Sequence, residues 1–214
     1  MLVAIAGGHG QIALRLARLL ADRGDAARSL IRNPDHAGDV RAAGGEPVVC
    51  DLEHATADEV AEAIKAADAV VFAAGAGPGS GPDRKWTMDH GGAVKLIEAA
   101  KQAGIDRYVM VSSMGADAQA GDDDTFSVYL RAKGRADEDL RAAGLDHTII
   151  RPGRLTNGPG TGHVTLADTV GRGEVPRDDV AAVLAAALAA PSTIGRTAEL
   201  VGGDVPVEEA VKAL

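Results

Sequence analysis

The chain alternates between short apolar runs and longer segments in which apolar residues recur every three or four positions. Runs of four to six mostly apolar residues are typical of buried strands, and the second spacing is typical of helices that bury one face. The sequence predicts six such strands, at residues 2–6, 27–31, 46–50, 69–73, 108–111 and 147–150. Because a predicted helix follows each of the first five, neighbouring strands are expected to run parallel.

Four of the predicted helices end in the same way. Gly24, Gly44, Gly104 and Gly144 each follow a helical stretch with a basic residue near its end, and each precedes a strand. Glycine adopts the left-handed conformation that terminates helices, and a basic side chain complements the helix dipole there. This repeated unit predicts an α/β protein with a doubly wound parallel sheet, the Rossmann fold, whose ligand crevice lies at the carboxyl ends of the strands.

The character of the sequence changes after Arg151. Residues 152–163 are rich in glycine and proline and predict a loop. The elements predicted beyond this loop are a helix, a short strand and a final helix, at residues 178–190, 197–201 and 207–214. About 60 residues are too few for a large substrate domain. We therefore expect a single domain over residues 1–214, in which 152–214 form a small cap on the substrate side.

The 214-residue chain is long enough for one domain with a sizeable core, and 46% of its residues are hydrophobic. Its formal net charge of −9 and the lack of a dense basic run argue against nucleic acid and anionic membranes as partners. No apolar segment approaches the ~20 residues of a membrane span, and the first apolar run is too short for a signal peptide. We expect a cytoplasmic protein that binds a small-molecule substrate, and the sequence leaves the oligomeric state open.

The first predicted strand is followed at once by a glycine-rich turn and a helix, in the sequence AGGHGQIA at residues 6–13. This arrangement sets the pyrophosphate of a dinucleotide on the N-terminus of the helix. Gly7 permits the tight turn, and Gly10 lets the backbone approach the phosphates. The cofactor contacts are expected to include His9, Gln11 and Ile12. The alternative is a tight strand-to-helix turn that binds no ligand.

The end of the second strand is expected to decide which cofactor binds. An acidic residue at this place binds the ribose hydroxyls of NAD, whereas a basic one suits the 2′-phosphate of NADP. Arg32 ends this strand, and its planar guanidinium group matches a phosphate. The sequence therefore predicts NADP(H), with NAD(H) as the less favoured cofactor. An ordinary surface arginine is the alternative interpretation of Arg32.

Further strand ends are expected to face the same crevice. Asp51, with Leu52 beside it, is predicted to contact the adenine amino group, although a helix-start or loop role is equally open for Asp51. Small residues after the fourth strand let the adenosine ribose lie against the backbone: Ala73, Ala74 and Gly75. Pro152 and Gly153 are expected to turn the chain over the nicotinamide end. Histidine and cysteine residues show no metal-ligand spacing, so no metal site is expected.

Candidate catalytic residues follow the fifth strand, which ends in Ser112 and Ser113. Tyr129 and Lys133 are four positions apart and share a helix face. A nearby ammonium group favours the phenolate form of a tyrosine, and Ser113 is suited to hold a carbonyl oxygen by a hydrogen bond. Ser113, Tyr129 and Lys133 are expected to protonate a carbonyl as a nicotinamide delivers hydride, while Ser112 and Lys133 also contact the cofactor. The alternative has Tyr129 packed on the sheet and Lys133 in solvent.

Taken together, these motifs resemble the NAD(P)H-binding, NmrA/YwnB-like group of atypical short-chain dehydrogenases/reductases, which is similar to the biliverdin and flavin reductases. The matching segments run through almost the whole chain, at residues 6–13, 31–34, 50–52, 111–115, 129–133, 144–153 and 177–181. The resemblance implies a Rossmann fold that binds pyrophosphate at Gly7 and Gly10 and the 2′-phosphate at Arg32.

The same resemblance implies that Ser113, Tyr129 and Lys133 occupy the catalytic positions of the group. The chain departs from the group in two places of the glycine loop, where it has His9 in place of a frequent threonine and Ala13 in place of a frequent glycine. Both residues are compatible with cofactor binding at the loop.

The function predicted from these features is NADPH-dependent reduction of a small carbonyl, quinone or flavin-like acceptor. One alternative is a regulatory protein that senses NADP(H) without turnover, as some relatives in the group do. The other is a nucleotide-sugar epimerase or dehydratase. The short C-terminal segment disfavours this last alternative, because a sugar nucleotide needs a larger second domain to close over it.

Overall fold

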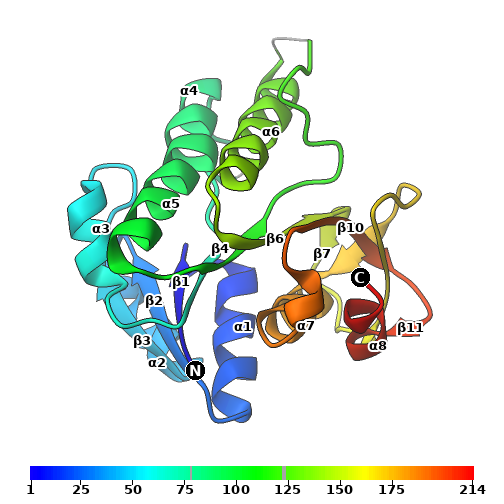
Figure 1. Cartoon of the computed structure of the whole chain (residues 1–214), viewed down its shortest axis with the longest axis horizontal. Coiled ribbons are helices and arrows are strands. Elements are labelled where there is room, and N and C mark those ends of the chain that lie inside the picture. Colours follow the sequence, from blue (N-terminus) through cyan, green and yellow to red (C-terminus); the bar gives the residue numbers. More distant parts are fainter. Residues whose placement is uncertain (78, 122–123) are drawn as a thin grey trace.

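The computed structural model describes residues 1–77, 79–121 and 124–214 and is built around a nine-stranded sheet (Figure 1). The strands of this sheet lie in the order β11-β8-β10-β6-β5-β4-β1-β2-β3. Their bounds are β1 (Leu2–Ala6), β2 (Ala26–Ile31), β3 (Gly45–Val49), β4 (Ala69–Phe72), β5 (Arg107–Val111), β6 (Asp146–Pro152), β8 (His163–Ala167), β10 (Arg196–Gly202) and β11 (Val205–Pro206). Two further strands, β7 (Arg154–Thr156) and β9 (Glu174–Pro176), pair with each other in a separate ladder.

Helices connect the strands and cover both faces of the sheet. They are α1 (Gln11–Asp22), α2 (Ala37–Ala42), α3 (Ala57–Ala63), α4 (Pro82–Arg84), α5 (Gly91–Ala103), α6 (Thr125–Ala142), α7 (Arg177–Leu188) and α8 (Val207–Lys212). A π-helical turn at Lys85–His90 joins α4 to α5. Figure 1 shows α5 and α6 on one side of the sheet and α1 and α7 on the other. Within the described ranges, none of the helices has both the length and the apolar character needed to cross a membrane.

The sheet is parallel over most of its width. Strands β1 to β6 and β10 run parallel to one another, and β8 pairs antiparallel with both β10 and β11 at one edge. The chain passes outward from β1 to β2 and β3 and then returns to β4 on the other side of β1. This reversal leaves a crevice between the carboxyl ends of β1 and β4. The predicted doubly wound fold is confirmed, and the six predicted strands agree with the observed ones within two residues at each end.

The core is aliphatic, because only 2% of the residues are aromatic. Alternate residues of β1 enter opposite halves of this core. Val3 and Ile5 pack beneath α1 and α7, whereas Ala4 and Ala6 pack beneath α3 and α5. Because both faces of the strand are buried, the strand is apolar at every position instead of alternating with polar residues.

The segment after Arg151 partly continues the central sheet. The predicted helices and strand correspond to α7, β10 and α8, and β8, β10 and β11 extend the sheet beyond β6. The loop prediction over residues 152–163 is wrong at residues 154–156, which form β7. A three-residue strand among glycines and prolines shows no alternation of its own, and it forms here because β9 supplies its hydrogen-bonding partner.

A buried ion pair links α6 to the sheet. Asp137 of α6 is fully buried, and the guanidinium group of Arg151 in β6 donates to its Oδ2 atom at 2.8 Å from Nε and 2.7 Å from Nη2. Burial raises the pKa of the Asp137 carboxyl, and the positive charge of Arg151 opposes this change. The pair fixes the position of α6, which carries Tyr129 and Lys133, against the neighbouring strand.

Candidate cofactor and substrate site

The glycine loop between β1 and α1 has little room for side chains. Gly7 has a φ of +79°, and a Cβ atom there would lie 2.7 Å from the Cα atom of Ala74. At Gly8 a Cβ atom would lie 2.5 Å from the Cβ atom of Ser29, so this glycine lets the loop pack on β2. Gly10 directly precedes α1, where among the described residues no side chain caps the helix and no acidic residue stands in its first turn. The N-terminus of α1 thus offers backbone N–H groups to an anion.

We expect Gly7→Ala to lower the free energy of unfolding by about 1–3 kcal/mol, because it combines a strained φ with a backbone collision. Gly24→Ala is the matched control, since Gly24 has a φ of +81° but nothing lies within 4 Å of a Cβ atom there. Urea unfolding of both variants separates the two effects. Equal losses would contradict a close approach between the glycine loop and Ala74.

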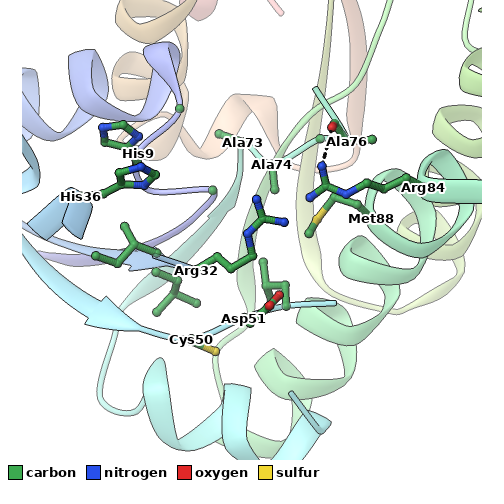
Figure 2. A pocket seen from close by; sticks show the side chains of 16 residues that line it. His9, Arg32, His36, Cys50, Asp51, Ala73, Ala74, Ala76, Arg84 and Met88 are labelled. Atoms are coloured by element: carbon green, nitrogen blue, oxygen red, sulfur yellow. Dashed lines mark hydrogen bonds between the residues drawn. The ribbon is translucent and has the colours of Figure 1, made fainter. Parts of the chain in front are cut away.

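The first of three cavities along the crevice has a volume of about 330 Å³ and lies at the carboxyl ends of β1, β2, β3 and β4 (Figure 2). Nine of the residues predicted to bind cofactor line it: Gly7, His9, Gly10, Arg32, Asp51, Leu52, Ala73, Ala74 and Gly75. His36, Arg84 and Met88 also line it and were not among the residues predicted to bind cofactor. The rings of His9 and His36 stack with their centroids 3.6 Å apart at the edge of this cavity. Its size and position suit the adenosine half of a dinucleotide.

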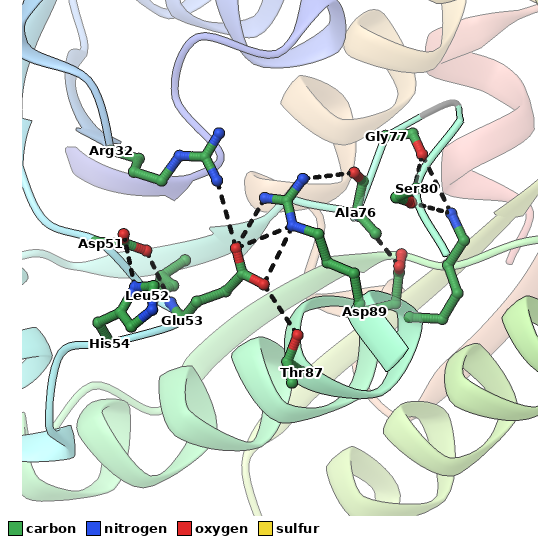
Figure 3. Close-up of polar contacts among 12 residues, drawn as sticks. Arg32, Asp51, Leu52, Glu53, His54, Ala76, Gly77, Ser80, Thr87 and Asp89 are labelled. Carbon is green, nitrogen blue, oxygen red and sulfur yellow. Dashed lines mark hydrogen bonds and ion pairs between the residues drawn. The ribbon is translucent and has the colours of Figure 1, made fainter. Parts of the chain in front are cut away.

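A carboxylate joins the two arginines of this cavity (Figure 3). Glu53 lies in the loop after β3, and its side chain is 11% exposed. Arg84 donates to both carboxylate oxygens of Glu53, at 2.8 Å from Nη2 to Oε2, and the Thr87 hydroxyl donates to Oε1 at 2.9 Å. The hydrogen bond from Arg84 lowers the pKa of the Glu53 carboxyl, while burial acts in the opposite direction.

Arg32 is held only weakly by the same carboxylate. Its Nη1 atom lies 3.4 Å from Oε2 of Glu53, and its side chain is 57% exposed. Because the charge of Glu53 is already matched by Arg84, the guanidinium group of Arg32 retains donors for an anion in the cavity. The end of β2 carries no acidic side chain beside Arg32.

The second cavity has a volume of about 620 Å³ and lies between the N-terminus of α1 and the first turns of α6. It is lined by five further predicted residues, Gln11, Ile12, Ser112, Tyr129 and Lys133. The side chains of Lys133 and Asp89 are 4% and 1% exposed, and Lys133 Nζ lies 3.4 Å from Asp89 Oδ1. Lys133 also donates to the carbonyl oxygens of Val111 at 3.2 Å and Ala74 at 3.5 Å. The alternative of a solvated Lys133 is therefore wrong.

The buried partner of Lys133 explains one of the predicted glycines. Asp89 accepts a hydrogen bond from the backbone N–H of Ala76 at 3.1 Å through Oδ2. A Cβ atom at Gly75 would lie 2.9 Å from Asp89 Oδ1. The lack of a side chain at Gly75 thus makes room for this carboxylate, a role that the sequence did not reveal.

Tyr129 lies where the second cavity meets the third. Its hydroxyl makes no hydrogen bond to another described residue. The ring of Phe126 lies 6.0 Å away, centroid to centroid, and Lys85 Nζ lies 5.6 Å from the Tyr129 ring centroid. The Tyr129 side chain thus faces ligand space instead of packing on the sheet, and its hydroxyl is available to a ligand.

The third cavity has a volume of about 960 Å³ and completes the crevice beyond β5 and β6. The last predicted residues, Ser113, Pro152 and Gly153, line it. The Ser113 hydroxyl donates to the carbonyl oxygen of Met114 at 3.3 Å, a long hydrogen bond that a ligand can replace. Arginines 154, 172 and 177 also line this cavity and were not predicted.

The three cavities form one continuous crevice. Gly10 and residues 73–75 border both the first and the second cavity, and Ser112, Tyr129 and Arg177 are among those that border both the second and the third. Every residue predicted for the site therefore lines this crevice, while its chemical role stays a prediction. The unpredicted charged residues include Arg84 of α4, Lys85 and Asp89 of the π-helical turn and Arg154 of β7, where the sequence has no ligand motif.

Known proteins resemble this chain over its whole length. It is 42% identical to a Bacillus subtilis (strain 168) protein called uncharacterized sugar epimerase YhfK, and the match covers 100% of both chains. A solved Bacillus halodurans structure, provisionally described as an NAD-dependent epimerase/dehydratase, is 37% identical with a TM-score of 0.93 and covers 100% of both chains.

A reductase also shares the fold. ChuY of Escherichia coli O157:H7, described as an anaerobillin reductase, is 25% identical with a TM-score of 0.79 over 96% of this chain and 98% of that one. The sequence model of a family described as NAD(P)H-binding matches residues 7–191. These residues include the glycine loop, the ends of β2 to β6 and the first turns of α6 and α7. The chain therefore belongs to the NAD(P)H-binding family.

Proposed function

We propose that this protein is an NADPH-dependent oxidoreductase that reduces a carbonyl, quinone or flavin-like group of a small molecule. The observation that carries this proposal is the position of Tyr129. Its hydroxyl, which makes no hydrogen bond to another described residue, lies where the cavity beside α1 meets a larger cavity beyond β5 and β6. A proton donor at this junction has the cofactor crevice on one side and room for a substrate on the other.

The residues of the crevice fit a dinucleotide phosphate. The N-terminus of α1 offers backbone donors to a pyrophosphate, and the close packing at Gly7 keeps this loop free of side chains. Arg32 provides exposed donors for a 2′-phosphate, and Asp51 is suited to the adenine amino group. We place NADP(H) ahead of NAD(H) because the end of β2 carries this arginine and no carboxylate.

When bound, the cofactor supplies a hydride to the acceptor. In the proposed reaction Tyr129 donates a proton to the acceptor oxygen, and Ser113 holds that oxygen by a hydrogen bond in place of the Met114 carbonyl. Lys133 keeps a positive charge beneath the cavity, fixed by Asp89 and by two backbone carbonyls. Lys133 and Asp89 are almost fully buried, so little water reaches their ion pair.

A titration with NADPH and NADH tests the cofactor assignment. We expect Arg32→Ala to lower the ratio of NADPH to NADH affinity by about 10- to 100-fold, because a charge-assisted hydrogen bond contributes about 1.5–3 kcal/mol. Nicotinamide fluorescence measures both affinities. The control is Arg18→Ala, since Arg18 is an exposed residue of α1 that lines none of the three cavities. An unchanged ratio in Arg32→Ala would refute the role of Arg32.

An epimerase acting on nucleotide sugars is a second candidate, because the names of two similar proteins refer to epimerases. Such an enzyme returns the hydride to its substrate and consumes no NADPH overall. Product analysis with nucleotide sugars, alongside nicotinamide absorbance with carbonyl and quinone acceptors, distinguishes the two reactions.

A further inference from the structure

On the basis of the reductase function above, we propose that the substrate is an anion, a carboxylate or phosphate group attached to an apolar, planar body. The third cavity, at the end of the crevice away from the adenosine side, is the part of the site that faces the substrate. Its lining combines arginines with apolar side chains.

Positive charge dominates the wall of this cavity. Arg154, Arg172 and Arg177 all line it, and none of the described residues that line it is an aspartate or glutamate. The chain as a whole has a formal net charge of −9, so the charge of this cavity wall is opposite in sign to that of the protein. Guanidinium groups bind carboxylates and phosphates through two parallel hydrogen bonds, which makes them suited to anionic substrates.

Two of the three arginines, Arg172 and Arg177, form no ion pair with a carboxylate among the described residues. Arg154 forms an ion pair with Glu174 at the rim. Arg177 donates to Oδ1 of Asn157 at 2.7 Å, and this amide oxygen carries no charge. Arg172 is exposed and has no hydrogen bond or ion pair with another residue in the described part of the chain.

The acidic residues beside Arg177 have other partners. Asp178 forms an ion pair with Arg15 and accepts a hydrogen bond from the backbone N–H of Gly160. Asp179 accepts hydrogen bonds from the backbone N–H groups of Thr161 and Gly162 at 3.0 and 2.9 Å. Neither carboxylate lines the cavity, and the charge of Asp178 is matched by that of Arg15.

Close backbone packing brings the arginines to one wall. A Cβ atom at Gly153 would lie 2.4 Å from the carbonyl oxygen of Gly173, and the N–H of Arg154 donates to the same oxygen at 2.9 Å. This contact places residue 154, which begins β7, beside residue 172, which precedes β9. Arg177 then begins α7 directly after β9. The three guanidinium groups thus come from one small structural unit.

Apolar side chains form much of the rest of the cavity wall and indicate that the body of the substrate is apolar. Met114, Leu130 and Leu155 line it, and so does Phe126, which is 63% exposed. A large exposed aromatic ring at the rim of a cavity gains free energy when a flat apolar ligand covers it. Tyr129 borders the same cavity, so a substrate held by the arginines reaches the proposed proton donor.

The proposed reaction leaves the anionic group unchanged. Hydride adds to the carbonyl carbon of the substrate, Tyr129 donates a proton to the carbonyl oxygen, and NADPH becomes NADP⁺. The carbonyl is reduced to an alcohol, and solvent returns the proton to Tyr129. The carboxylate or phosphate serves only to orient the substrate against the arginines.

Three benzaldehydes test the proposal by NADPH oxidation: 4-formylbenzoate, 4-formylphenyl phosphate and the neutral methyl 4-formylbenzoate. We expect kcat/KM for at least one anion to exceed that of the ester by about 10-fold or more at low salt. The better anion identifies a carboxylate or a phosphate as the recognised group.

Arg172→Gln and Arg177→Gln should each reduce the preference for the anion over the ester by about 3- to 10-fold, whereas Arg18→Gln, with the same change in net charge, should leave it unaltered. Equal kcat/KM values for ester and anions would overturn the proposal while leaving the reductase function standing.

A binding measurement tests the anion site without turnover. The fluorescent probe 1-anilinonaphthalene-8-sulfonate is a planar apolar anion, and N-phenyl-1-naphthylamine has the same ring system without the sulfonate. We expect the double variant Arg172→Gln/Arg177→Gln to weaken binding of the anionic probe by about 10-fold or more relative to the neutral one. If this difference appears and no aldehyde is reduced, the anion site stands and carbonyl reduction fails. If both probes weaken alike, the anion site is refuted.

Discussion

Replacing Tyr129 by phenylalanine is expected to lower kcat/KM for carbonyl reduction by about 10²- to 10⁴-fold, the usual contribution of a positioned general acid. The variant removes one hydroxyl that has no hydrogen bond to another described residue, and it retains the ring beside Phe126 and Lys85. NADPH affinity should therefore stay within about twofold of the original. Steady-state kinetics with an aldehyde acceptor and a fluorescence titration measure the two quantities.

The chain offers a matched control for this substitution. Tyr108 is the only other tyrosine, and it is buried in β5 with its hydroxyl donating to the carbonyl oxygen of Ala93 at 3.3 Å. It lines none of the three cavities. Tyr108→Phe should retain carbonyl reduction. Equal turnover in Tyr129→Phe would rule out a proton-donor role and leave only acceptors of the flavin type.

Replacing Lys133 by methionine is expected to lower the free energy of unfolding by about 3–5 kcal/mol, because it leaves a charge buried without its partner. Asp89 is 1% exposed, and Lys133 is the cation that pairs with it among the described residues. The methionine fills a similar volume, so the loss reflects charge more than packing. Urea unfolding measures it, and a loss below about 1 kcal/mol would contradict a buried ion pair of this kind.

A second substitution separates stability from catalysis. Asp89→Asn combined with Lys133→Met removes both charges and keeps an oxygen to accept the hydrogen bond from Ala76 N–H. We expect this double variant to recover most of the lost stability, because two neutral groups replace the unpaired charge. Carbonyl reduction should stay low if Lys133 acts on Tyr129 or on the cofactor. Full recovery of activity would show that Lys133 serves the fold alone.

The features that could be predicted from the sequence depend on neighbouring residues. The glycine turn at Gly7 and the end of β2 at Arg32 are set by local spacing, and the crevice follows from the alternation of strands and helices. Tyr129 and Lys133 are likewise joined by a helical spacing. Each of these residues lines the crevice because carboxyl ends of parallel strands meet at one edge of the sheet.

The features that could not be predicted depend on contacts between distant segments. Arg84 reaches the crevice because Glu53, 31 positions earlier, binds its guanidinium group. Asp89 becomes the partner of Lys133 only when the π-helical turn packs against α6. No periodicity of the sequence connects these residues before the chain is folded.

The separate pairing of β7 with β9 divides the protein into two parts that can change independently. The strands that end at the adenosine side belong to the nine-stranded sheet, whereas the residues that line the third cavity from beyond β6 lie in the two-stranded ladder or next to it. Residues 154 and 172 line neither of the cavities that contain the glycine loop and Arg32, so substitutions there leave both in place. New substrate preferences can evolve, or be engineered, on this small unit while the machinery for the nicotinamide cofactor is inherited intact.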